Sequence, residues 1–74
     1  MPGSVYKVIE LVGTSPDSWE AAARAALEAA ATSVQDLRVA EVVQTDVRLD
    51  NNKIVEYRVK MAVSFKYHPE LHEQ

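Results

Sequence analysis

EYRVKMAVSFKY, residues 56–67, is the stretch that decides the fold. Its apolar residues take every second position from Val59 to Tyr67, and mostly charged or polar residues lie between them. Such alternation is typical of a β-strand with one buried face. At about 3.3 Å per residue the strand would be roughly 40 Å long, about twice the usual length. The chain must therefore supply something to cover a long apolar face.

The rest of the chain is too short to build a large core around that strand. Its 74 residues predict a single domain, 1–74, and we expect flexible termini at 1–3 and 68–74. Folds below about 80 residues usually need disulfides, a metal or partner subunits. The chain has no cysteine, which excludes disulfides and favours a reducing, cytoplasmic setting. Self-association is therefore the expected source of stability.

Charge and hydropathy argue against nucleic-acid and membrane partners. The net charge of −3 gives no basic patch for nucleic acid or an anionic membrane surface. The N-terminal MPGSVYKVIELVG has no basic region ahead of an apolar run, so it does not resemble a signal peptide. The alanine-rich segment carries Arg24 and Glu28 and is too short to span a bilayer. We expect a soluble protein.

The remaining segments predict a β-α-β-β order and an α+β fold. Residues 4–12 are rich in Val, Ile and Tyr and indicate a first strand. Ser15 is the expected N-cap, before Pro16, of a helix from Asp17 to about Val34. Its apolar stripe holds Trp19, Ala23, Ala26, Leu27, Ala30 and Val34.

A hairpin follows the helix. Residues 37–49 and 54–67 form its strands, and Asn51 and Asn52 form a two-residue turn that pairs Asp50 with Lys53. In this register, one face of the hairpin pairs Val39 with Ser64, Glu41 with Ala62, Val43 with Lys60 and Thr45 with Arg58. The other face carries Ala40, Val42, Met61, Val63 and Phe65 and suits the helix.

The helix and the hairpin differ in length. A helix of about 18 residues is only about 27 Å long, whereas the hairpin reaches roughly 40–45 Å. Val55, Tyr57 and Val59 should therefore extend beyond the helix, where other subunits would cover them.

From Ser4 to Phe65 the chain resembles the dodecin family. VYKVIELVGTS at 5–15 matches the family's opening, and Leu37, Arg38, Glu41, Val42 and the alternating final strand follow in order. The resemblance implies a hollow homododecamer in which a three-stranded antiparallel sheet wraps partly around one helix. It also implies a small-ligand storage protein that is not an enzyme, and the sequence shows no nucleophile–base pair.

Most relatives bind flavins stacked in pairs, using a Trp in the second strand and a Gln in the third. Val39 stands at the Trp position and Arg58 at the Gln position. Val39 offers no ring, and Arg58 donates hydrogen bonds but accepts none. We therefore do not expect FMN or riboflavin in the usual mode, and flavin storage stays the alternative. The resemblance implies that the family's flavin-site positions fall on Val39, Thr45, Arg58 and Lys60.

A dodecin subgroup that lacks the Trp, with one member described as calcium-binding, resembles this chain more closely. The shared pattern falls on Arg38-Val39-Ala40, Asp46, Asp50, Lys53 and Tyr57-Arg58. Asp46, Asp50 and Asn52 gather oxygen atoms near the hairpin turn, and calcium takes six to eight oxygen ligands. One hairpin cannot supply them all, so copies or waters must complete a site. The alternative is an ordinary polar turn.

Other candidate sites have structural alternatives. Arg58 and Lys60 could bind an anion, or could form ion pairs with Glu41 and Glu56. His68 and His72 have the spacing of zinc ligands on a helix, but Pro69 favours an unstructured end. Trp19 is expected in the core or an interface. The function expected from the sequence is thus a storage shell with calcium as its candidate ligand, or a ligand-free scaffold.

Overall fold

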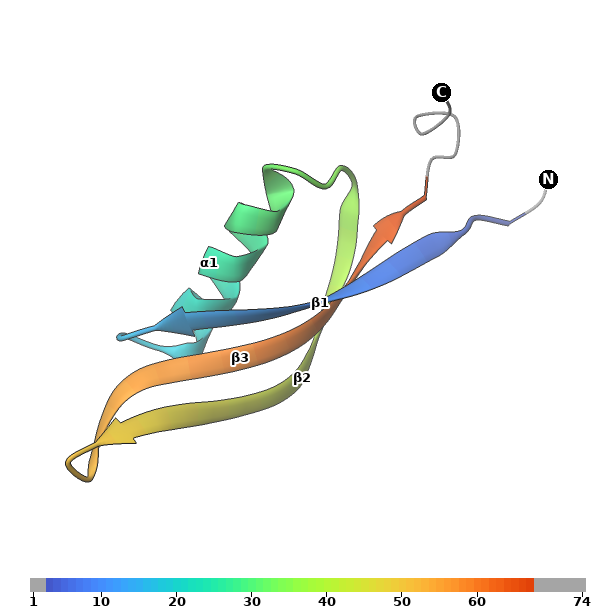
Figure 1. Ribbon diagram of the computed structural model, residues 1–74. Coiled ribbons are helices and arrows are strands. Elements are labelled where there is room, and N and C mark those ends of the chain that lie inside the picture. Colours follow the sequence, from blue (N-terminus) through green and yellow to red (C-terminus); the bar gives the residue numbers. More distant parts are fainter. Residues whose placement is uncertain (1–2, 68–74) are drawn as a thin grey trace.

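Three strands and one helix form the computed structural model, which describes residues 3–67 (Figure 1). The elements are β1 (Tyr6–Ser15), α1 (Trp19–Ala31), β2 (Leu37–Asp50) and β3 (Lys53–Lys66). The strands form one antiparallel sheet in the order β1-β3-β2. The predicted β-α-β-β order is therefore confirmed. The expected flexible stretch 68–74, with His68 and His72, lies outside the described residues.

The core lies between α1 and the middle of the sheet. Ala22 from α1 and Val59, Met61 and Val63 from β3 are buried. Partly buried apolar residues surround them, namely Ile9, Leu11, Ala23, Ala26, Leu27 and Leu37. Met61 and Val63 face the helix as predicted. Val59 was expected to extend beyond the helix, but it is 1% exposed, so that prediction was wrong.

Gly13 explains why Val59 is covered. β1 continues through Gly13 to Ser15 instead of ending at residue 12, and Gly13 pairs with Val59 on β3. A Cβ atom at Gly13 would overlap the backbone carbonyl of Ala22 and crowd the Cβ of Ala26. Because glycine has no side chain, the backbone of α1 can lie directly on β1 at this point. The start of the helix therefore covers the Gly13–Val59 pair.

The helix is shorter than the sequence suggested. α1 has 13 residues, about 20 Å, and its N-cap is Ser18, whose Oγ accepts a 3.0 Å hydrogen bond from the N–H of Ala21. Ser15, the expected N-cap, instead accepts a 3.0 Å hydrogen bond from the N–H of Asp17 in the preceding turn. No helix within residues 3–67 is long and apolar enough to cross a membrane.

The hairpin register agrees with the prediction from Val39 to Val42 and at the turn, and it differs elsewhere, because Leu37 pairs with Phe65 instead of Lys66. Val39 pairs with Ser64, Glu41 with Ala62 and Asp50 with Lys53, as expected. The register shifts between Val42 and Gln44, so the predicted partners of Lys60 and Arg58, Val43 and Thr45, were wrong. Those partners are Gln44 and Asp46, whereas Thr45 pairs with Val59 on the helix side.

A β-bulge at Val43 accounts for the shift, because an extra residue in one strand moves every later side chain to the other face. A second irregularity between Arg48 and Leu49 restores the register before the turn. Asn51 and Asn52 both have positive φ values, 55° and 64°. These values fit the two-residue turn expected from the sequence.

Many apolar side chains in residues 3–67 have no cover within the chain. The molecule measures 55 × 21 × 16 Å, and its radius of gyration is 15.3 Å, whereas a compact domain of this length has about 11 Å. Val42 was expected to face the helix but is 55% exposed, because α1 packs on β1 and β3 and leaves the edge strand β2 bare. The other large exposed apolar residues are Val5, Tyr6, Val8, Val12, Trp19, Val39, Val43, Leu49, Ile54 and Val55.

Candidate ligand and metal site

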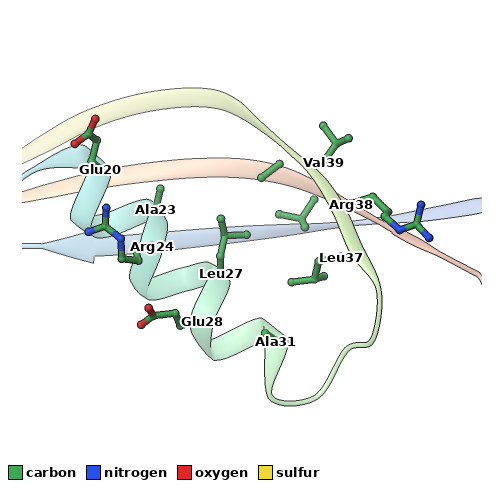
Figure 2. Close-up of a pocket in the computed structure, with 11 residues that line it drawn as sticks. Glu20, Ala23, Arg24, Leu27, Glu28, Ala31, Leu37, Arg38 and Val39 are labelled. Carbon is green, nitrogen blue, oxygen red and sulfur yellow. The ribbon is translucent and has the colours of Figure 1, made fainter.

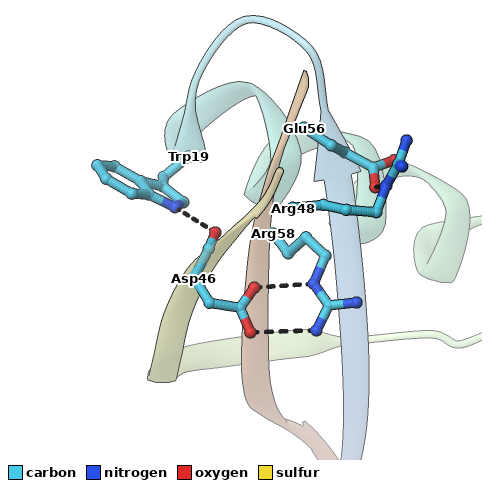
Figure 3. Close-up of polar contacts among 5 residues, drawn as sticks. All are labelled: Trp19, Asp46, Arg48, Glu56 and Arg58. Atoms are coloured by element: carbon cyan, nitrogen blue, oxygen red, sulfur yellow. Dashed lines mark hydrogen bonds and ion pairs between the residues drawn. The ribbon is translucent and has the colours of Figure 1, made fainter. Parts of the chain in front are cut away.

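Arg58 lies at the centre of the sheet face that points away from the helix. It stands on β3 between Thr14 of β1 and Asp46 of β2. Its Nε and Nη2 atoms donate to the two carboxylate oxygens of Asp46 at 2.8 and 3.1 Å (Figure 3). This bidentate, charge-assisted pair lowers the pKa of Asp46 and raises that of Arg58. The bulge at Val43 brings these two residues opposite each other.

The backbone of Asp46 is also held from the helix. The indole Nε1 of Trp19, the first residue of α1, donates a 3.0 Å hydrogen bond to the carbonyl oxygen of Asp46 (Figure 3). The Trp19 ring meets Tyr57 edge-on, with centroids 5.2 Å apart and planes at 82°, a favourable aromatic geometry. Trp19 therefore anchors the start of the helix to the hairpin, and its side chain stays partly exposed.

The cations on this face already have partners within the chain. Arg58 and Lys60 line a cleft of about 210 Å³ with Val12, Gln44 and Asp46. The Nζ of Lys60 is 3.9 Å from Oε1 of Glu10. Glu56, expected near Arg58 or Lys60, instead accepts a 3.0 Å hydrogen bond from Arg48 (Figure 3). The carboxylates that pair with the two cations are thus Asp46 and Glu10.

The four positions predicted to face a ligand do not form one cluster. Arg58 and Lys60 share the cleft. Thr45 lies on the opposite, helix-side face because of the bulge. Val39 is 63% exposed near the start of β2, where it lines a separate groove against the helix. The register shift, which alternation alone does not signal, separates Thr45 from Arg58 and Lys60.

The metal candidates are oxygen donors, but one chain does not bring them together. Asp46 and Asp50 are four residues apart on β2, a distance of about 13 Å along a strand. The carboxylate of Asp46 already binds Arg58. Within residues 3–67 no group of three or more His, Cys, Asp or Glu side chains could hold a metal ion. Oxygen donors suit calcium, but a complete calcium site would need donors from outside this chain.

Sequence reasoning missed a groove between α1 and β2. It has a volume of about 700 Å³. Apolar residues from the helix and the sheet line it, namely Ala23, Leu27, Ala31, Leu37, Val39, Ala40 and Val63, together with charged Glu20, Arg24, Glu28 and Arg38 (Figure 2). The groove exists because β2 is an edge strand, and the sequence pattern gave no strand order.

The match to the family model described as Dodecin covers residues 5–68. The chain belongs to the dodecin family. It is 52% identical over 66 residues to a calcium dodecin of Mycobacterium tuberculosis, covering 89% of this chain and 93% of that protein. A dodecin of Thermus thermophilus is 39% identical over 64 residues, covering 86% and 93%.

Solved dodecin structures share this fold. The crystal structure of the M. tuberculosis calcium dodecin, described as calcium-chelating with a novel calcium-binding site, has a TM-score of 0.79 and 52% identity and covers 89% of this chain and 94% of that one. A dodecin from Streptomyces davaonensis has a TM-score of 0.85 and 30% identity, covering 90% and 98%. The family resemblance and the dodecin fold seen in the sequence are confirmed.

Proposed function

We propose that this dodecin is a non-catalytic, cytoplasmic storage shell of twelve identical chains that binds calcium and does not bind stacked flavin. The observation that carries the proposal is which residues occupy the two positions that the family resemblance assigns to flavin. Val39 presents no aromatic ring, and the Arg58 guanidinium is bound to both carboxylate oxygens of Asp46. A flavin would find neither a stacking surface, worth about 0.5–1.5 kcal/mol per ring pair, nor a free group that accepts hydrogen bonds.

The exposed apolar surface supports assembly. A chain of 74 residues with large apolar side chains on both faces of its sheet has little intramolecular core. A large amount of exposed apolar surface usually marks a protein interface. A shell of identical subunits would cover these residues on every copy.

The calcium proposal rests on the similarity to calcium dodecin and on the donor atoms of the hairpin. Asp50 and Asn52 lie at the exposed turn, where a neighbouring copy can add oxygen ligands. Asp46 is the third proposed ligand and would exchange its ion pair with Arg58 for the metal. Because no single chain completes the site, calcium binding should depend on assembly.

Two measurements test the proposal. Light scattering should give a mass about twelve times that of the 8.2 kDa chain. Titration calorimetry should show calcium binding, and Asp50→Asn should weaken it. The control variant Asp17→Asn, which changes an acidic residue outside the hairpin, should leave calcium binding unchanged. Micromolar binding of riboflavin or FMN with quenched flavin fluorescence would contradict the proposal and favour flavin storage.

A ligand-free scaffold is the second candidate function. It is favoured by the pairing of Arg58 and Lys60 with acidic residues of their own chain, because the positive charges in the cleft are then already balanced without a ligand. The scaffold predicts an intact assembly whose melting temperature does not change with calcium, magnesium, riboflavin or FMN. A calcium-dependent rise in melting temperature would exclude it.

A further inference from the structure

We propose that the cleft lined by Arg58, Lys60 and Gln44 is a binding site for a small tetrahedral oxyanion, such as phosphate or sulfate. In the structure the carboxylate of Asp46 takes the place of that ion on Arg58. The site is separate from the proposed calcium storage and shares one residue with it, Asp46. An oxyanion would bind when the carboxylate leaves or loses its charge.

Arg58 holds the carboxylate of Asp46 in the way that an arginine holds an oxyanion. Its Nε and Nη2 atoms donate to the two carboxylate oxygens at 2.8 and 3.1 Å. Two parallel N–H···O bonds of this kind also suit the oxygens of a phosphate group. The third nitrogen of the guanidinium, Nη1, takes part in neither bond and points away from Asp46 (Figure 3). Arg58 therefore has the geometry of an oxyanion ligand already in place.

Lys60 and Gln44, which pair across β3 and β2, add donors to the same cleft. The Nζ of Lys60 is 3.9 Å from Oε1 of Glu10, which is too long for a hydrogen bond, so its N–H groups can bind another acceptor. The side-chain amide of Gln44 can also donate. The cleft has a volume of about 210 Å³, below the range of about 300–1,000 Å³ for pockets that bind drug-sized ligands. Its size therefore suits a small ion.

The charge of the cleft depends on Asp46. Among the described residues that line the cleft, Asp46 is the one acidic residue, and Arg58 and Lys60 are the cations. While the carboxylate of Asp46 is bound, its negative charge lies against the guanidinium. When the carboxylate leaves or loses its charge, both cations face the cleft and the guanidinium lacks its acceptor. Both changes favour an incoming anion.

The carboxylate of Asp46 can leave without moving the strand. The backbone of Asp46 is held separately, by the 3.0 Å hydrogen bond that Trp19 donates to its carbonyl oxygen. The side chains of Arg58 and Asp46 are 46% and 39% exposed, and ion pairs at the surface contribute little to stability. The ion pair can therefore be exchanged while the sheet stays intact.

Titration calorimetry with sulfate tests the site, with chloride at equal ionic strength as the reference. The natural protein should bind sulfate weakly, because Asp46 competes for Arg58. Asp46→Asn should bind sulfate about fivefold more tightly, the ratio expected when an exposed ion pair no longer competes. Asp46→Ala is an independent variant in which no side-chain oxygen remains to hold Arg58. Adding Arg58→Gln to either variant should remove the gain.

Glu56→Gln is the matched control for charge. It also removes one negative charge from the hairpin, but Glu56 bonds to Arg48, which is not among the residues that line the cleft. Its sulfate affinity should equal that of the natural protein. An equal gain in Glu56→Gln would overturn the inference, because net charge alone would then account for the binding. Two Asp46 variants without any gain would overturn it as well.

Sulfate titrations with calcium present separate this inference from the proposed function. If Asp46 binds calcium, calcium should free Arg58 and tighten sulfate binding to the natural protein, and sulfate should strengthen calcium binding by the same factor. Asp46→Asn should show no such effect and corrects for pairing of the two ions in solution. A gain in the Asp46 variants with no effect of calcium on the natural protein would support the oxyanion site and remove Asp46 from the calcium ligands. Calcium binding that Asp46→Asn weakens, with no gain in sulfate affinity, would keep calcium storage and overturn the oxyanion site.

Discussion

Replacing Gly13 by alanine should destabilise this protein, although replacing a glycine within a strand by alanine normally increases stability. Alanine at such a site usually adds about 0.5–1 kcal/mol by reducing the freedom of the unfolded chain. Here the new Cβ would overlap the carbonyl group of Ala22, a backbone atom of the helix that cannot rotate away. Overpacking of this kind costs about 1–3 kcal/mol, so we expect a net loss of about 1–2 kcal/mol.

The assay is thermal unfolding at a fixed chain concentration, because dissociation of the proposed shell would accompany unfolding. A domain of this size loses about 4–8 °C per kcal/mol, so Gly13→Ala should melt about 5–15 °C lower. Gly3→Ala is the matched control, since no atom lies within 4 Å of its Cβ position, and it should change little. An unchanged or higher melting temperature for Gly13→Ala would refute the close approach of α1 to β1.

Three further predictions follow from named contacts. Met61→Ala removes a core side chain that is 1% exposed and should cost about 2–5 kcal/mol in urea unfolding; a smaller loss would contradict its central place in the core. Arg58 lowers the pKa of Asp46, so their pair should stabilise the fold above the usual carboxyl pKa of about 4 and lose that effect as pH falls through the lowered value. Between neutral and acid pH, the melting temperature of Asp46→Asn should therefore fall less than that of the natural protein. Equal falls in the two proteins would contradict the prediction. Asn52 has φ 64°, so Asn52→Ala should lower stability by about 1 kcal/mol while Asn52→Gly should not; equal unfolding midpoints for the two variants would count against the positive-φ turn.

Alternation and turn chemistry were enough to predict the order of elements. The period-two pattern of β3 and the Asn51-Asn52 pair specify a hairpin whose end residues, Asp50 and Lys53, pair as expected. The start of the helix was predicted wrongly because two nearby serines compete for the N-cap position. Ser15 and Ser18 are both good N-caps, and tertiary packing through Gly13 keeps Ser15 in the strand.

The candidate site was harder to predict because its geometry depends on one extra residue. Without the bulge at Val43, Thr45 would face Arg58 and Asp46 would lie on the helix side. Valine is common in regular strands, so the presence of Val43 in the sequence does not indicate a bulge. The groove depends on the strand order, which the hydrophobic pattern of β2 does not specify. Pattern reasoning therefore located the polar residues but not the Asp46–Arg58 pair.

The irregular edge formed by β2 has a consequence for newly made chains. A single chain exposes a long outer strand rich in valine, the kind of surface on which polypeptides stack into amyloid-like ribbons. The bulge at Val43 interrupts the regular spacing of hydrogen-bonding groups that another strand would need to join. The same extra residue that aligns a carboxylate with a guanidinium should thus also hinder the addition of a foreign strand to this edge.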